Sequence, residues 1–183
     1  MYSVTRHTAE ISVSDYLESY VDIPTFHEAC TRCTNYGSVW SCPPYDFDVE
    51  SYWKNYQKLH LIASKIVFDE ELLARTWTQE EQTELLNRIL PVEKQKLTEE
   101  LMKAEQEYPG SISLSAGSCQ SCKSCSRPSQ MPCCHPDTMR YSIESLGGNV
   151  GLTLQKLMGL KLEWMEEGKL PHHFVLVCGL LIR

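Results

Sequence analysis

Eight of the nine cysteines in this chain lie in two short windows of the sequence. The first window holds Cys30, Cys33 and Cys42, and two prolines follow the last of them. The second window holds five, in the order Cys119, Cys122, Cys125, Cys133 and Cys134. Three of these five repeat at every third residue, in a segment rich in Gly, Ser and Pro. Thiols at this spacing are typical ligands of a soft metal centre.

The triple spacing of Cys119, Cys122 and Cys125 favours an iron–sulfur cluster of the 4Fe-4S type. Each thiolate of such a loop can bind a different iron corner, and a fourth cysteine from elsewhere completes the set. A single zinc ion usually takes one Cys-x2-Cys pair from each of two loops, so a third cysteine at the same spacing is surplus for zinc. Zinc is therefore the alternative cofactor.

The fourth thiolate of the second window has three candidates, Cys133, Cys134 and Cys42. Adjacent cysteines diverge and rarely serve one metal together. One of Cys133 and Cys134 is therefore expected to be a bystander or to serve the other site. Cys42 is a candidate because Pro43 follows it, as a proline follows the last cluster ligand of bacterial ferredoxins.

The first window is one ligand short of four. His27, three residues before Cys30, and a thiolate from the second window are the two candidates for the missing ligand. Eight clustered cysteines suit either two local sites or two shared ones. Trp40 could shield such a centre from water or be an ordinary core aromatic.

The remaining cysteine, Cys178, lies in an apolar run and is expected to be a small buried hydrophobe. That run, residues 174–182, is the longest in the chain and is far shorter than the roughly 20 residues that span a bilayer. No apolar export signal begins the sequence, so we expect a cytoplasmic protein without a membrane partner. Because the cytosol keeps thiols reduced, dense cysteine there indicates metal binding more than disulfides.

Composition sets further limits on the class of protein. The net charge of −7 argues against nucleic acid as a partner. A length of 183 residues suits one domain with a substantial core, so residues 1–183 are expected to form a single metal-binding domain.

Hydrophobic patterning predicts an α/β (α+β) fold, with a mixed sheet of about four strands, packed helices and two cysteine-rich metal-binding loops. The expected strands are residues 3–13, 59–68, 111–115 and 174–182. Helices are expected after Ser14, from Pro24, at 49–57, at 78–108, from Asp137 to about Gly147, and at 149–160. Pro91 predicts a kink or two successive helices within 78–108.

Both windows match the pattern of a known family. The matching residues are Cys30-x2-Cys33 through Cys42-Pro43-Pro44, Gly117 through Cys125, Pro128, Pro132-Cys133, His135-Pro136, Arg140 and residues 142–147. In these the chain resembles a prokaryotic family of small predicted metal-binding proteins that is frequent in anaerobes. The resemblance implies metal binding in the cytoplasm and supplies no substrate. The family pattern has an Arg where Cys134 stands, which implies that Cys134 is an extra thiol and Cys133 the ligand.

Three functions follow from these observations. The first is a protein that carries one or two cysteine-ligated iron–sulfur clusters, with an electron-transfer or redox-accessory role and a redox protein as partner. The second is a structural zinc module for partner binding, in which two Cys-x2-Cys pairs meet at one tetrahedral ion, for example Cys30 and Cys33 with Cys119 and Cys122. The third is an enzyme with an open cluster site. The predicted metal ligands are Cys30, Cys33, Cys42, Cys119, Cys122, Cys125 and Cys133.

Overall fold

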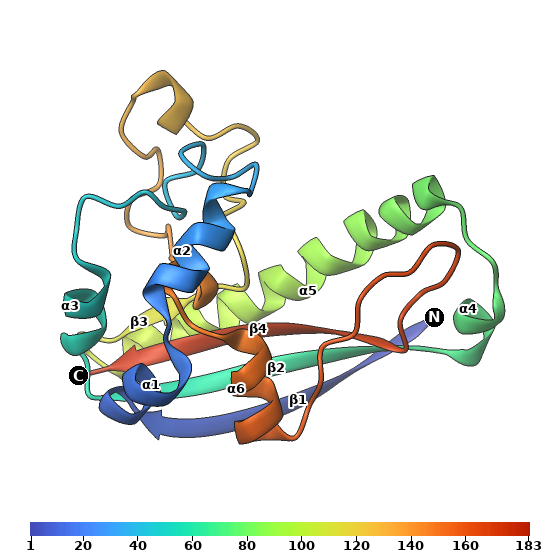
Figure 1. Ribbon diagram of the computed structural model, residues 1–183, viewed down its shortest axis with the longest axis horizontal. Coiled ribbons are helices and arrows are strands. Elements are labelled where there is room, and N and C mark those ends of the chain that lie inside the picture. The colour runs from blue at the N-terminus through green and yellow to red at the C-terminus, as the bar shows by residue number, and fades with distance from the viewer.

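A four-stranded antiparallel sheet forms the centre of the computed structural model, which describes residues 1–183 (Figure 1). The strands are β1 (Tyr2–Ser12), β2 (Lys58–Phe68), β3 (Ile112–Leu114) and β4 (His173–Ile182). Their order across the sheet is β1-β2-β4-β3, and all three pairings are antiparallel. The predicted α+β class with about four strands is confirmed. The sheet is not mixed, because no two paired strands run in the same direction.

Helices cover both faces of this sheet. They are α1 (Val13–Tyr20), α2 (Ile23–Thr31), α3 (Val49–Lys54), α4 (Glu70–Ala74), α5 (Gln79–Glu107) and α6 (Val150–Thr153), which a π-helical turn continues to Met158. Side chains of β2 pack on both faces of the sheet, as expected for a strand that is buried on both sides. Leu59 and Leu61 pack toward α1 and α6, whereas Ile62 and Ile66 pack toward α5.

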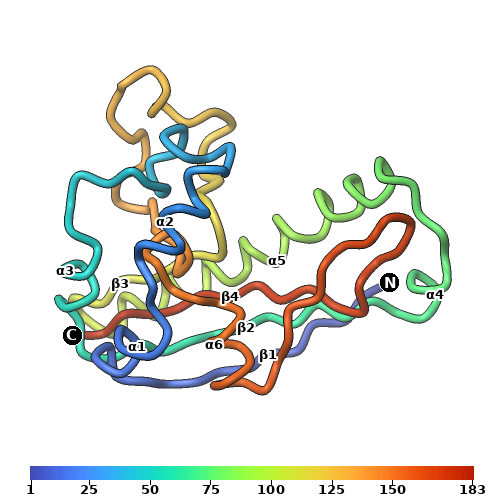
Figure 2. Tube along the Cα trace, viewed as in Figure 1, coloured from blue at the N-terminus to red at the C-terminus, as the bar shows by residue number.

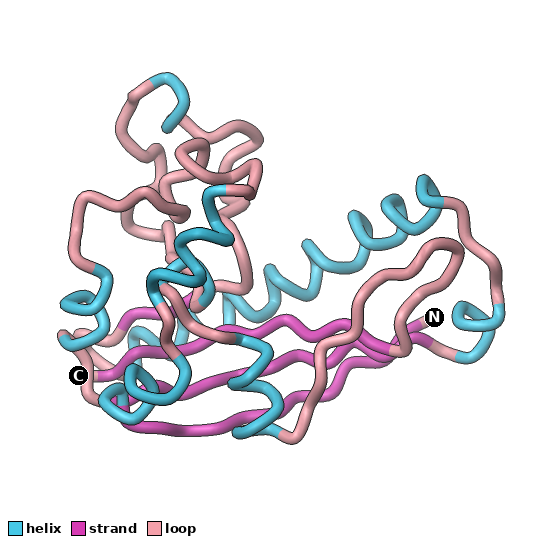
Figure 3. The backbone as a smooth tube through the Cα atoms, viewed as in Figure 1, coloured by secondary structure: helices cyan, strands magenta, loops and turns pink.

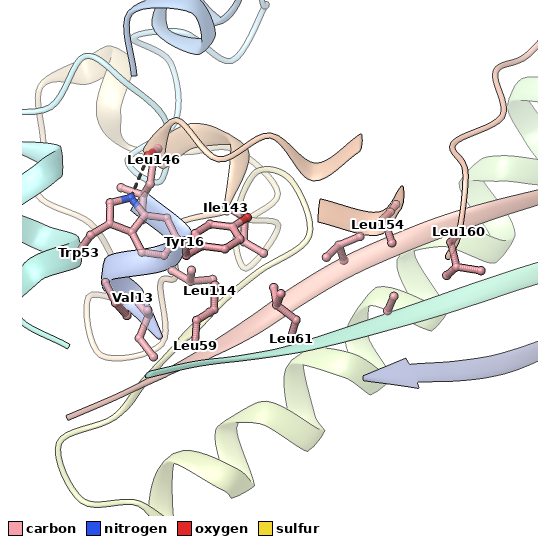
Figure 4. Close-up of a cluster of buried hydrophobic side chains, with 13 residues drawn as sticks. Val13, Tyr16, Trp53, Leu59, Leu61, Leu114, Ile143, Leu146, Leu154 and Leu160 are labelled. Atoms are coloured by element: carbon pink, nitrogen blue, oxygen red, sulfur yellow. Dashed lines mark hydrogen bonds between the residues drawn. The ribbon is translucent and has the colours of Figure 1, made fainter. Parts of the chain in front are cut away.

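Buried aromatic side chains organise the α1 face (Figure 4). The hydroxyl oxygens of Tyr16 and Thr153 lie 2.8 Å apart, and the Trp53 indole donates to the Leu146 carbonyl at 2.9 Å. These bonds satisfy polar atoms that burial would otherwise leave without partners. They also attach the segment after the second cysteine window to α1 and α3.

Helix α5 lies along the opposite face as one continuous helix of 29 residues. It begins with a capping box in which Thr78 and Glu81 bond to each other's backbone N–H groups. Pro91 neither divides nor ends it, so the alternative of two successive helices is wrong. The Leu85 and Ile89 side chains before Pro91 and the Leu97 side chain after it all pack against the sheet. This packing stabilises the helical conformation on both sides of the proline.

The helix predicted from Asp137 is wrong. Residues 137–143 form no helix, and only the 3-10 turn η2 (Glu144–Leu146) follows. Their backbone pairs with the end of β3 instead: the Ser115 N–H donates to the Tyr141 carbonyl at 2.7 Å, and Ser115 forms a bridge with Ser142. Tertiary pairing has outweighed the local capping signal.

Glu105 of α5 fastens this region together. Its Oε1 accepts hydrogen bonds from the backbone N–H and the hydroxyl of Ser113, each at 2.6 Å. Arg140 binds both carboxylate oxygens, at 2.7 and 2.6 Å, and the two charged side chains are largely buried. Burial alone would raise the pKa of Glu105, but these hydrogen bonds and the guanidinium charge lower it.

Substituting Glu105→Gln should lower the free energy of unfolding at pH 7 by about 1.5–3 kcal/mol, the value of hydrogen bonds to a charged group. Because the folded-state pKa lies below the ordinary carboxyl value, this stabilisation is complete above that value and is lost as the pH falls through the folded pKa. Urea unfolding at pH 7 and at pH 3 measures both effects. Glu84→Gln, at an exposed position of the same helix, is the control. Equal losses for the two variants at pH 7 would contradict the role of Glu105.

Candidate metal centre

The two cysteine windows form one lobe above the sheet, although 76 residues separate Cys42 from Cys119 in the sequence (Figures 1 and 2). Helix α2 carries Cys30 in its last turn and leads into the first window. The second window follows β3. Both consist mainly of loops (Figure 3), so their own backbone bonds do not fix their shape.

Arg127 of the second window holds the first window in place. Its guanidinium donates to the carbonyls of Val39 at 2.8 Å and Pro44 at 2.5 Å, and also to the carbonyl of Cys42. The same group lies over the Trp40 ring, with its carbon 5.1 Å from the ring centroid. One cation therefore satisfies three carbonyls of a loop that has no strand or helix to bind them.

Trp40 and Ser41 make the reciprocal contacts from the first window. The Trp40 indole donates to the Met131 carbonyl at 3.1 Å and lies 3.3 Å from the Ser126 hydroxyl. The Ser41 hydroxyl accepts the Cys119 N–H at 2.8 Å. Trp40 thus joins the two loops. The sequence suggested either shielding of a metal centre or ordinary core packing for this residue, and it did not predict this connection.

The five thiols of the second window line one cavity of about 370 Å³. They are Cys119, Cys122, Cys125, Cys133 and Cys134, and Trp40 and His135 complete part of the wall. Burial raises the pKa of the Cys122 thiol, and the other four thiols raise it further. All five thiols line the same cavity, and four of them affect the pKa of the fifth. The structure therefore brings this window's predicted ligands together.

The three thiols of the first window form a separate group. Burial raises the pKa of Cys30 and of Cys42, and the thiols that add to these shifts are only those of the same window. Cys33 is exposed on the turn after α2, while Cys30 and Cys42 are partly covered. His27 is engaged elsewhere, since its Nε2 lies 3.4 Å from the Tyr36 hydroxyl.

No three His, Cys, Asp or Glu side chains converge closely enough to hold a single metal ion. Cys30 and Cys33 therefore do not meet Cys119 and Cys122 at one point in this structure. The donor set nonetheless suits a metal group with several corners, because four or more thiols border one space without meeting at a point. Cysteines 119, 122, 125 and 133 are the residues that would hold it.

The sequence analysis did not identify Arg127, which connects the two windows. It had one available signal, since Arg127 is the only arginine between the second window's first and last cysteines. The expectation for Cys178 is confirmed: it is buried among Leu97, Leu101 and Leu180, and burial raises its pKa to about 12.

A family model described as a predicted metal-binding protein (DUF2284) matches residues 18–182. Neither the curated proteins nor the solved structures contain a significant match. In the structure itself, no helix combines the length and apolar character needed to cross a membrane.

Substituting Arg127→Ala should release the loop of residues 39–44 from the second window. Loss of even one charge-assisted hydrogen bond costs about 1.5–3 kcal/mol locally, so amide hydrogen exchange in residues 39–44 and 119–134 should accelerate roughly tenfold or more. Exchange measured by mass spectrometry on the full chain checks this. The exposed Arg88→Ala provides the comparison. Unchanged exchange in both loops would show that Arg127 does not hold them.

Proposed function

Because the chain belongs to the DUF2284 family of predicted metal-binding proteins, we propose that its second cysteine window holds an iron–sulfur cluster of the 4Fe-4S type. The proposed role is electron transfer, or a redox-accessory role, with a redox protein as partner in the cytoplasm. When bound, such a cluster supplies a one-electron redox couple whose potential depends on its surroundings.

The observation that carries this proposal is the ring of thiols around one cavity of about 370 Å³. A tetrahedral zinc ion needs four donors at roughly 2.0–2.3 Å from one point. A cubane needs its thiolates at separate corners several ångströms apart. Thiols that share a space without converging favour the second arrangement.

Backbone N–H groups already point at two of these sulfurs. The N–H of His135 donates to Cys133 Sγ at 3.4 Å, and the N–H of Ser121 donates to Cys119 Sγ at 3.5 Å. Such bonds stabilise thiolates and are one means by which a protein adjusts a cluster's potential. Trp40 in the wall limits the access of water.

The fourth ligand in this proposal is Cys133. It is partly covered and accepts a backbone hydrogen bond, whereas the adjacent Cys134 is exposed. Neighbouring side chains diverge, so the two thiols are not expected to bind the same corner. Cys134 is then a spare thiol at the mouth of the cavity.

Substituting Cys122→Ser should remove most of the iron and acid-labile sulfide from protein that is made and handled without oxygen. It removes one of four ligands, and the hydroxyl that replaces the thiol is a poor ligand for a cluster. Cys178→Ala is the control and should keep the full content, because Cys178 lies in the apolar core. Full iron in Cys122→Ser, or stoichiometric zinc without sulfide in the parent, would overturn the proposal.

A paired comparison separates the two adjacent cysteines. Cys133→Ser should lose iron to the same extent as Cys122→Ser, whereas Cys134→Ser should retain it. Iron and sulfide per chain, together with the visible absorbance that dithionite bleaches, provide the measurement. The reverse result would assign the fourth ligand to Cys134.

A further inference from the structure

A half-buried lysine of α5 holds the beginning of the second cysteine window. The ammonium group of Lys94 donates to the carbonyl of Ser118, the residue directly before Cys119. The Cys119 N–H, at the other end of the same peptide group, donates to the Ser41 hydroxyl at 2.8 Å. The peptide group that leads into the predicted ligand is therefore held at its carbonyl by α5 and at its N–H by the first window.

The segment of residues 118–121 borders both Lys94 and the thiol cavity. All four residues of this segment line the cavity that the five thiols share. Two of them, Gln120 and Ser121, also line a second hollow of about 290 Å³, and the rest of its wall comes from α5 and includes Lys94. Asn35 of the first window donates to the Ser118 hydroxyl at 3.3 Å and further fixes this segment. Lys94 is therefore separated from the thiol cavity only by a short stretch of backbone.

No carboxylate of the protein lies within ion-pair distance of Lys94. The acidic side chains of α5 that form ion pairs do so with other cations: Glu81 with Arg75, Glu93 with Lys96, Glu100 with Arg6 and Glu105 with Arg140. The hydrogen bond of Lys94 goes to a neutral carbonyl. A cation that is withdrawn from water without a counter-charge is costly. An anionic group in the neighbouring cavity would offset this cost.

The other ionisable groups around Lys94 agree with this direction. Burial lowers the pKa of the Lys94 amino group, and the charges of Cys178, Cys119, Glu144 and Cys42 act against that shift. Cys178 is a neutral thiol at pH 7, because burial raises its pKa to about 12. Burial also raises the pKa of the Glu144 carboxyl group, which disfavours its charged form. Among these groups, Cys119 is the one that directly follows the carbonyl to which Lys94 bonds.

We propose that Lys94 is the fixed cation of the second window: it positions the ligand Cys119 through the Ser118 carbonyl, and its charge raises the reduction potential of the cluster. This inference rests on the proposed function, because it concerns the cluster proposed there. Lys94 bonds to a backbone carbonyl and not to a sulfur, so it is a positioning residue. The charge that it supplies belongs to α5, which packs on the sheet, and not to the cysteine loops themselves.

The sign of the effect follows from the charge of the cluster. One electron from the redox partner makes the cluster and its four thiolates more negative by one charge. A nearby cation therefore stabilises the reduced form more than the oxidised form, and the reduction potential rises. Salt in the solvent screens a half-buried charge much less than an exposed one, so the effect of Lys94 should persist at high ionic strength.

The test compares the reduction potentials of the full-length wild type and two variants, all prepared without oxygen. Lys94→Gln replaces the charge with a neutral N–H donor, and Lys94→Met removes both the charge and the donor. A redox titration, followed by the visible absorbance of the cluster, measures each potential. In both variants the equilibrium constant for reduction should fall about tenfold, which for one electron is a potential about 59 mV more negative. The difference should remain in about 1 M NaCl, where the Debye length is about 3 Å.

Two further variants serve as controls. Lys94→Arg keeps the positive charge and should keep the potential of the wild type. Lys103→Gln removes an exposed lysine from the same helix and should also leave the potential unchanged. Iron and acid-labile sulfide per chain show whether each variant still holds the cluster, and circular dichroism shows that the fold is retained.

Each outcome decides the inference. Unchanged potentials in Lys94→Gln and Lys94→Met, with iron and sulfide retained, would refute the electrostatic role of Lys94 and leave the cluster itself intact. Loss of iron from these two variants but not from Lys94→Arg would support the requirement for a cation. Loss from all three would reduce Lys94 to a structural residue and refute the inference. Wild-type protein without iron and sulfide would instead refute the proposed function, and this inference with it.

Discussion

The metal-binding lobe depends on one guanidinium. Arg127 binds three backbone carbonyls of a loop that lies more than 80 residues away in the sequence, and stacks on the Trp40 ring of that loop. Apart from the last turn of α2 at Cys30 and the short 3-10 helix η1 (Arg127–Ser129), the two cysteine windows consist of loops. Contacts of Arg127 and Trp40 join the two windows, and Arg140, which follows the second window, bonds to Glu105 of α5. The geometry of the thiols is therefore a property of the pair of loops and not of either loop alone.

That arrangement explains why the eight thiols divide as three and five. Arg127 and Trp40 connect the loops, and none of the first window's three thiols lines the cavity of the second. The larger group has enough sulfur for a cluster, with one thiol to spare. The smaller group has three thiols and lies outside that cavity. Metal binding to either group would add to stability, since metal binding to such loops contributes folding free energy.

The sequence predicted the sheet better than the site. Apolar, β-branched runs at residues 59–68 and 174–182 identified the two central strands, because strands buried on both faces are continuously apolar. The helix expected from Asp137 failed because that backbone pairs with Ser115 and its arginine binds Glu105, neither of which a local signal reveals. Spacing identified the cysteines as a group. It could not divide them, because the arrangement of the two loops depends on contacts between Arg127 and a distant segment.

The central claim is that these sulfurs surround a polynuclear cluster. The most direct test is the quantification of iron, zinc and acid-labile sulfide per chain on wild-type protein that has been expressed and purified without oxygen. The account predicts about four sulfides and about four irons per chain. Protein that contains no sulfide and only one or two zinc ions per chain would contradict it.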